Sequence, residues 1–252
     1  MKVKNGFKRS FSSFLIVVLL LTSIPLTQIS ILDSFNVGNL FGNTAKAFSY
    51  SEEYMGSELK ESDLTPLNEF KNIEVNCNYK NNNSTESVVF SYDDGMLFES
   101  SERLSTDIAK VSVALAGAAY RKDYIAKALE SMDKYEIIEN SSYDKKTTLY
   151  DNDSVAYTVS RKYVSYKGEK YAFYLVPVRG TPGSCEWYSN FNIGTTGNHL
   201  GFTTAANKVI TSIYNAMSND GMISGNRIVW LTGHSRGAAV ANIVAGKLSN
   251  SS

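Results

Sequence analysis

The 252-residue chain has no excess charge of either sign and is poor in cysteine and histidine. Its 25 basic side chains balance 25 acidic ones, so charge gives no reason to expect a nucleic-acid partner. Two cysteines and two histidines form no cluster with metal-ligand spacing, and neither a metal nor another cofactor is expected. Cys77 and Cys185 could pair in an oxidising compartment or could be unrelated thiols, and spacing alone leaves both readings open.

The N-terminus has the layout of a secretory signal. Basic residues within Met1 to Arg9 precede the apolar segment Phe14 to Leu21, and Ala45-Lys46-Ala47 offers a small-x-small cleavage site. We therefore predict a signal peptide over residues 1–47 and a secreted protein. The alternative is that Phe14 to Leu32 stays as an uncleaved membrane anchor. Membrane contact is expected only through this segment or at a lipid interface.

The remaining chain divides by composition at about residue 100. Residues 48–100 form a polar N-terminal extension, in which Lys80 to Thr85 is typical of a linker or a hairpin tip. Residues 101–252 alternate helical and strand patterns, which predicts an α/β sheet with helices on its faces. The predicted helices are Ser101 to Ala119, Tyr124 to Met132, Phe202 to Met217 and Val240 to Leu248, and the predicted strands are Tyr135 to Ile138, Val155 to Tyr166, Tyr171 to Val178 and Ile228 to Leu231.

The most informative stretch is the turn Gly233-His234-Ser235-Arg236-Gly237. It joins a buried-strand pattern to a helical one, as in the nucleophile elbow that pushes a serine hydroxyl clear of a sheet edge. Gly233 and Gly237 supply the small neighbours that this turn requires. The amide of Arg236 falls in the first helical turn, where it could stabilise an acyl oxyanion. The alternative is an ordinary strand-to-helix connection.

Two further motifs precede the elbow in the chain. They are Val178-Arg179-Gly180-Thr181, with Trp187 and Asn190 behind it, and His199-Leu200-Gly201-Phe202. Together and in this order, the three motifs resemble the class 3 (fungal lipase-like) branch of the α/β-hydrolases, over about residues 101–248. The resemblance implies an α/β-hydrolase-type sheet with flanking helices and a lipase or carboxylesterase acting on acyl (lipid) esters.

The resemblance also implies roles for individual residues. Ser235 would be the nucleophile, and Thr181 with the amide of Arg236 would form the oxyanion hole. The loop around Trp187, Tyr188 and Phe191 would be a lid for acyl-chain or interface contact, although a hydrophobic loop packed on its own domain is the alternative. Three other residues are expected outside the chemistry: Arg179 and His199 as structural residues, and His234 pointing away from the attack site.

The acid and base of the expected triad are missing. In this fold both follow the serine in the chain, yet no aspartate, glutamate or histidine follows Ser235. We therefore expect residues 101–252 to be a partial lipase-like domain, incomplete at its C-terminus, in a truncated or inactive form. The alternatives are a non-catalytic acyl-binding module and a hydrolase-like module that a second chain completes.

Overall fold

The computed structural model describes residues 20–21, 60–65, 67, 70–78, 85–99, 105–133, 135–144, 155–182, 190–195, 199–222 and 226–249. Several predictions fall outside these residues: most of the signal peptide with its cleavage site, Cys185, Trp187 and Tyr188. Within the described part, no helix is long and apolar enough to span a membrane.

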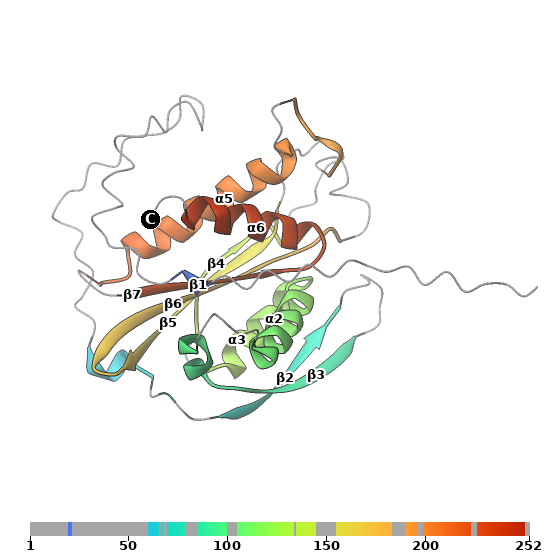
Figure 1. Ribbon diagram of the computed structural model, residues 1–252. Coiled ribbons are helices and arrows are strands. Elements are labelled where there is room, and N and C mark those ends of the chain that lie inside the picture. Colours follow the sequence, from blue (N-terminus) through green and yellow to red (C-terminus); the bar gives the residue numbers. More distant parts are fainter. Residues whose placement is uncertain are drawn as a thin grey trace, which may run out of the picture.

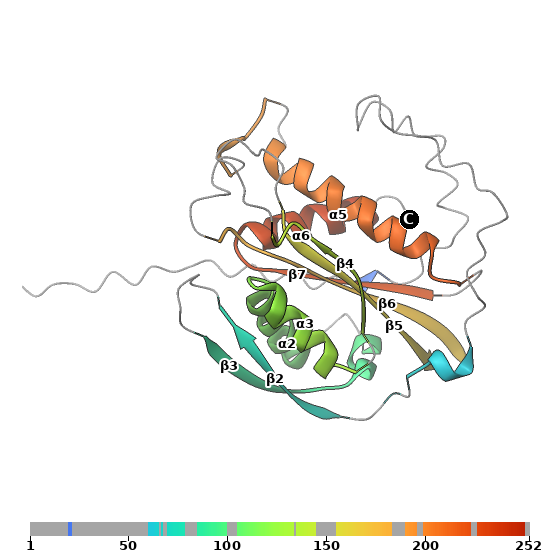
Figure 2. The same ribbon diagram turned by 180° about the vertical axis from the view of Figure 1, so that it is seen from behind.

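A mixed β-sheet forms the centre of the molecule (Figures 1 and 2). Its strand order is β1-β7-β6-β5-β4, in which β6 and β7 are parallel and the other pairs are antiparallel. β5 and β6 form a hairpin through Lys167 and Gly168, both at positive φ (53° and 83°). The strands are β1 (Leu20–Leu21), β4 (Glu136–Ser141), β5 (Tyr157–Tyr166), β6 (Glu169–Val178) and β7 (Asn226–Gly233).

Helices cover both faces of this sheet, which confirms the predicted α/β class. α5 (Leu200–Ser218) and α6 (Arg236–Ser249) lie on one face, and α2 (Thr106–Ala118) and α3 (Lys122–Ser131) lie on the other (Figure 1). Successive residues of β6 point to opposite faces, so Tyr174 enters the core under α5 and α6, whereas Phe173 enters the core under α2. Burial on both sides explains why this strand is apolar almost throughout.

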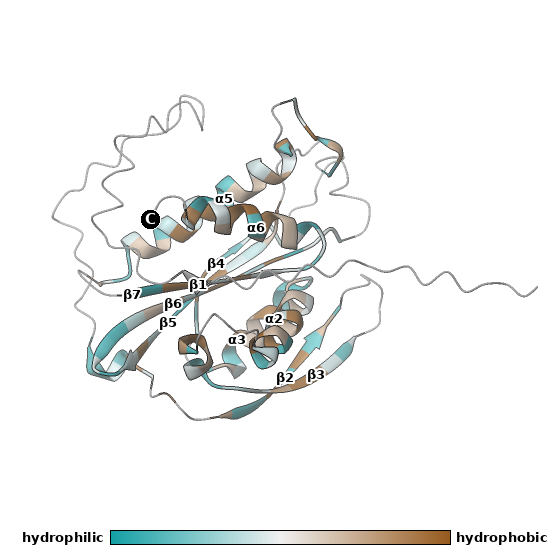
Figure 3. Cartoon of the chain, in the orientation of Figure 1, coloured by the Kyte–Doolittle hydropathy of each residue, from teal (hydrophilic) through white to brown (hydrophobic). Residues whose placement is uncertain are grey.

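The polar extension contains a hairpin that the sequence analysis did not predict as strands. β2 (Lys71–Cys77) and β3 (Glu86–Tyr92) pair antiparallel and pack on α2 and α3. The predicted loop at residues 80–85 lies between these two strands in the chain, and all of it except Thr85 falls outside the described residues. Figure 3 shows apolar residues along α2, between the sheet and this hairpin. Buried side chains of the hairpin share one core with α2, α3, β6 and β7.

Cys77 lies at the end of β2 as a free, buried thiol. Its Sγ donates to the Ala114 carbonyl oxygen of α2 at 3.3 Å. Burial and, to a smaller extent, the charge of Glu86 raise the pKa of this thiol to about 11. A thiol with so high a pKa is almost entirely protonated at neutral pH, so Cys77 behaves here as a small core residue.

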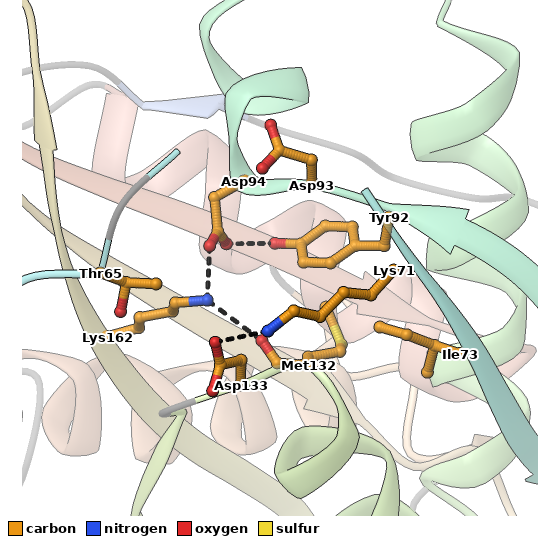
Figure 4. A pocket seen from close by; sticks show the side chains of 9 residues that line it. All are labelled: Thr65, Lys71, Ile73, Tyr92, Asp93, Asp94, Met132, Asp133 and Lys162. Atoms are coloured by element: carbon orange, nitrogen blue, oxygen red, sulfur yellow. Dashed lines mark hydrogen bonds and ion pairs between the residues drawn. The ribbon is translucent and has the colours of Figure 1, made fainter. Parts of the chain in front are cut away.

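A buried ion pair joins the hairpin to the sheet (Figure 4). Lys162 of β5 pairs with the Asp94 carboxylate, and its Nζ donates to the Met132 carbonyl oxygen at 3.0 Å. Asp94 belongs to the 3₁₀ helix η4 (Asp94–Phe98), and it also accepts from the Tyr92 hydroxyl at 2.5 Å. Burial raises the pKa of the Asp94 carboxyl, and Lys162 opposes this shift. The two charged side chains are 2% and 5% exposed, so each depends on the other for solvation.

We predict that Lys162→Met lowers the free energy of unfolding by about 3–5 kcal/mol, because it leaves the Asp94 carboxylate buried without its cation. Asp94→Asn added to that variant should recover much of the loss. Lys71→Met is the matched control, since it breaks an ion pair with Asp133 whose side chains are 44% and 42% exposed, and it should cost less than about 1 kcal/mol. Urea unfolding gives the free energy of unfolding of all three variants. Equal losses for Lys162→Met and Lys71→Met would show that the Lys162–Asp94 pair is no more important for stability than an exposed one.

Candidate active site

The predicted nucleophile and the predicted oxyanion residue leave the sheet at the same edge. β6 and β7 run parallel, and Val178 at the end of β6 is in register with Gly233 at the end of β7. Thr181 follows the first strand end, and Ser235 follows the second. The carboxyl edge of a parallel pair is where α/β sheets commonly bind ligands. The topology therefore brings Thr181 and Ser235 to neighbouring strand ends.

The turn at Ser235 has the strand–turn–helix geometry that the sequence predicts. Ser235 has a φ of +57°, a conformation uncommon for a residue other than glycine, and it is exposed. β7 ends at Gly233 and α6 begins at Arg236, so the serine stands at the corner between them. The Gly237 amide donates to the His234 carbonyl oxygen at 3.0 Å, which closes the turn. Backbone strain at an exposed serine is typical of a functional position.

Both glycines of the turn are required by close backbone contacts. A Cβ on Gly233 would lie 2.5 Å from the carbonyl carbon of Gly237. A Cβ on Gly237 would lie 2.2 Å from the Val178 carbonyl oxygen and 2.9 Å from that of Arg179. The first turn of α6 thus rests directly on the end of β6. Backbone atoms cannot move aside as a flexible side chain can, so these two positions admit no side chain.

Thr181 is held by a chain of hydrogen bonds that reaches the start of α5. The Asn190 side-chain amide donates to Thr181 Oγ1 at 3.1 Å. His199 Nε2 lies 2.9 Å from the Asn190 carbonyl oxygen, and the Phe202 amide donates to His199 Nδ1 at 3.3 Å. Since a backbone amide can only donate, Nδ1 is the acceptor and the proton is on Nε2. His199 is the N-cap of α5, which agrees with the structural role predicted for it.

The other histidine, His234, bonds to a tyrosine that follows α2. His234 Nδ1 lies 2.8 Å from the hydroxyl of Tyr120, which is buried after the end of α2. Burial lowers the pKa of the His234 imidazole below its usual value, which favours the neutral ring. No sequence pattern indicates a role for Tyr120, and Asn190 stands out in the sequence only as part of a motif. The place of Asn190 behind Arg179-Gly180-Thr181 was the one signal that could have assigned it.

The remaining predicted residues are Arg179 and those of the lid. The Arg179 guanidinium lies over the Tyr143 ring at 5.4 Å, and the Arg179 amide donates to the Ala156 carbonyl oxygen at 2.8 Å. These contacts agree with a structural arginine. Of the predicted lid residues, only Phe191 falls within the described chain, and it is 71% exposed. Ile193 is also exposed nearby in sequence, and the lid assignment stays a prediction.

The cavity in Figure 4 lies away from this edge, beside the middle of β5. Lys162 in its wall is in register with Phe173, which in turn pairs with Ile228 near the start of β7, far along the strand from Gly233. Its polar groups are those of the buried ion pair and its neighbours. Among the residues that the structure describes, no group of three or more histidine, cysteine, aspartate or glutamate side chains could hold a metal ion.

Comparison with known proteins finds no family model, no curated protein and no solved structure that matches the chain. The lipase-like interpretation therefore depends on the three motifs and on the geometry of the strand ends.

We predict that Gly237→Ala strongly destabilises the chain, because its Cβ would overlap the Val178 carbonyl oxygen. Gly246→Ala is the control in the same helix, where a Cβ meets nothing within 4 Å. It should stabilise α6 by about 0.5–1 kcal/mol, since alanine has the higher helix propensity. Thermal unfolding followed by circular dichroism measures both. A Gly237→Ala protein as stable as wild type would show that α6 does not rest on β6 as described.

Proposed function

We propose that this chain is a secreted serine hydrolase of the class 3 lipase type, built on an α/β-hydrolase sheet and acting on acyl esters of lipids. The observation that carries the proposal is Ser235, exposed and at positive φ on the corner between β7 and α6. In this proposal the Ser235 hydroxyl attacks the ester carbonyl, and the carbonyl oxygen becomes an oxyanion. The alcohol then leaves with the proton that the serine hydroxyl gave up, and water releases the acyl group as a free acid and restores the hydroxyl.

Thr181 and the Arg236 amide serve as the oxyanion hole in this proposal. Thr181 Oγ1 accepts a hydrogen bond from the Asn190 side chain, which leaves its own hydroxyl hydrogen to donate to the substrate oxygen. The Arg236 amide is the first of α6, where the helix dipole also favours negative charge. Removing one such donor typically costs about 3–4 kcal/mol of transition-state stabilisation.

The proton acceptor for Ser235 is proposed to come from outside the 252 residues. The chain has two histidines. His199 bonds to Asn190 and Phe202, and His234 bonds to Tyr120. Neither ring is therefore assigned as the base. Without a base, the oxyanion hole and substrate binding alone typically retain a rate about 10³- to 10⁴-fold above that in water.

An alkyl fluorophosphonate together with added imidazole tests this proposal. The probe phosphonylates an activated serine, and free imidazole can take the proton that no histidine of this chain is placed to accept. We expect a slow adduct on the peptide that contains Ser235, formed faster as the imidazole concentration rises, and none in Ser235→Ala. Thr181→Val keeps the side-chain shape but removes the hydroxyl, and it should slow labelling by about 100-fold. Intact-protein and peptide mass spectrometry give the rates.

A folded chain that stays unlabelled at Ser235, even at high imidazole, would overturn the hydrolase proposal. The same would hold if an adduct formed equally fast at several surface serines, because no activated site would then be present. Circular dichroism on the same samples shows whether the chain is folded.

A non-catalytic acyl-binding module is the second candidate, and the engagement of both histidines favours it. In that case a long-chain fatty acid should bind at one site, as calorimetry would show. p-Nitrophenyl esters should then be cleaved no faster by the chain with imidazole than by imidazole alone. Cleavage above the rate of imidazole alone, lost in Ser235→Ala, would rule out this alternative.

A further inference from the structure

We infer that Tyr120 is a positioning residue for the Ser235 site, because its hydroxyl bonds to the His234 ring and occupies the space that a side chain at position 180 would need. The inference deepens the proposed function and rests on it, since it assigns a residue that holds the nucleophile turn and the oxyanion residue in their relative places. Tyr120 itself is not proposed to touch the substrate.

The hydroxyl of Tyr120 lies where the two strand ends meet. It is 2.8 Å from His234 Nδ1, in the residue before the nucleophile. A Cβ built on Gly180 would lie 2.2 Å from the same hydroxyl oxygen and 2.7 Å from the His234 carbonyl oxygen. Gly180 in turn precedes Thr181. The hydroxyl oxygen of Tyr120 therefore bonds to the residue before Ser235 and lies beside the residue before Thr181, where only a glycine leaves room for it.

Tyr120 follows α2, and hydrogen bonds join this helix to β7. The tyrosine follows the C-cap of α2, where the Arg121 amide donates to the Ala118 carbonyl oxygen at 3.0 Å. α2 is bonded to β7 through Ser112, whose side-chain oxygen accepts from Trp230 Nε1 at 3.0 Å. The Ser112 carbonyl oxygen accepts from the Thr232 hydroxyl at 2.8 Å. A hydroxyl mounted on this frame has a defined position relative to the end of β7.

A defined position matters because the elbow is a short turn with a strained residue. Ser235 at a φ of +57° must be held by its surroundings. The backbone hydrogen bond from Gly237 to His234 fixes the turn on the side of α6, and the bond from Tyr120 fixes the His234 side chain on the side of α2. Small displacements of a reacting group from its productive geometry lower rates considerably.

The test compares Tyr120→Phe with Tyr163→Phe. The first removes only the hydroxyl that bonds to His234. The second removes a hydroxyl that donates to the Asp220 carbonyl oxygen at 2.5 Å, from a residue in register with Ala172 near the start of β6. We expect Tyr120→Phe to slow the maximal imidazole-supported phosphonylation of Ser235 about tenfold, in line with loss of one positioning hydrogen bond. The probe concentration at half-maximal rate should not change, and Tyr163→Phe should label at the wild-type rate.

His234 variants show whether Tyr120 acts through this ring. His234→Asn retains an acceptor near the place of Nδ1, so it should slow labelling less than His234→Ala. The double variant Tyr120→Phe/His234→Ala should be no slower than His234→Ala alone, because the two changes remove the same interaction. Additive losses would overturn the assignment of a Tyr120–His234 unit.

A second readout separates failure of this inference from failure of the proposed function. In ¹⁵N-labelled protein, Tyr120→Phe should move the backbone amide signals of Thr181 and Arg236, and Tyr163→Phe should leave them in place. Unmoved signals would overturn the positioning role whatever the labelling result. Shifted signals in a chain that never labels at Ser235 would support the positioning role and overturn the hydrolase proposal.

Discussion

The contact between the first turn of α6 and the end of β6 is the constraint on which the candidate site depends. A Cβ on Gly237 would lie 2.2 Å from the Val178 carbonyl oxygen, so the helix and the strand meet backbone to backbone. This contact, with the parallel register of β6 and β7, fixes the turn at Ser235 relative to Arg179, Gly180 and Thr181. A larger residue at position 237 would separate α6 from β6 and take Ser235 away from Thr181.

The polar side chains differ in pairing and exposure between the interior of the sheet and its carboxyl edge. At the start of β7 and the middle of β5, buried charges are neutralised by partners, as in the pair of Lys162 with Asp94 and that of Arg227 with Asp220. At the carboxyl edge, the polar groups include the exposed Ser235 and the half-buried Thr181 and His234. The ion pairs help to hold the strands in their relative positions. The carboxyl edge presents polar groups that solvent can reach.

Much of the fold and part of the site could be predicted from local sequence. The apolar run of β6, the turn around Ser235 and the spacing in α5 each carry their own signal, because periodicity reports burial directly. The β2–β3 hairpin was missed because only alternate residues, such as Ile73 and Val75, are buried. The polar residues Lys71, Asn72, Glu74 and Asn76 at the other positions gave the segment the composition of a loop.

The hydrogen bonds that organise the site could not be predicted in this way. Tyr120 and His234 are 114 positions apart in the chain, and neither residue alone indicates the other. The bond exists because α2 packs on β7, which is a property of the tertiary structure. Asn190 and Thr181 are only nine positions apart, yet no periodic pattern marks a bond between a loop and a strand end.

The position of α2 between the sheet and the β2–β3 hairpin has a consequence for its dynamics. From Val111 to Ala118 almost every residue is buried, and small residues such as Ala114 and Gly117 let both neighbouring layers approach closely. Water can reach the amides of this segment only when the sheet or the hairpin moves away. Hydrogen exchange there should therefore be among the slowest in the chain. Tyr120, just after the end of the same helix, takes its fixed position from a part of the molecule that we expect to open rarely.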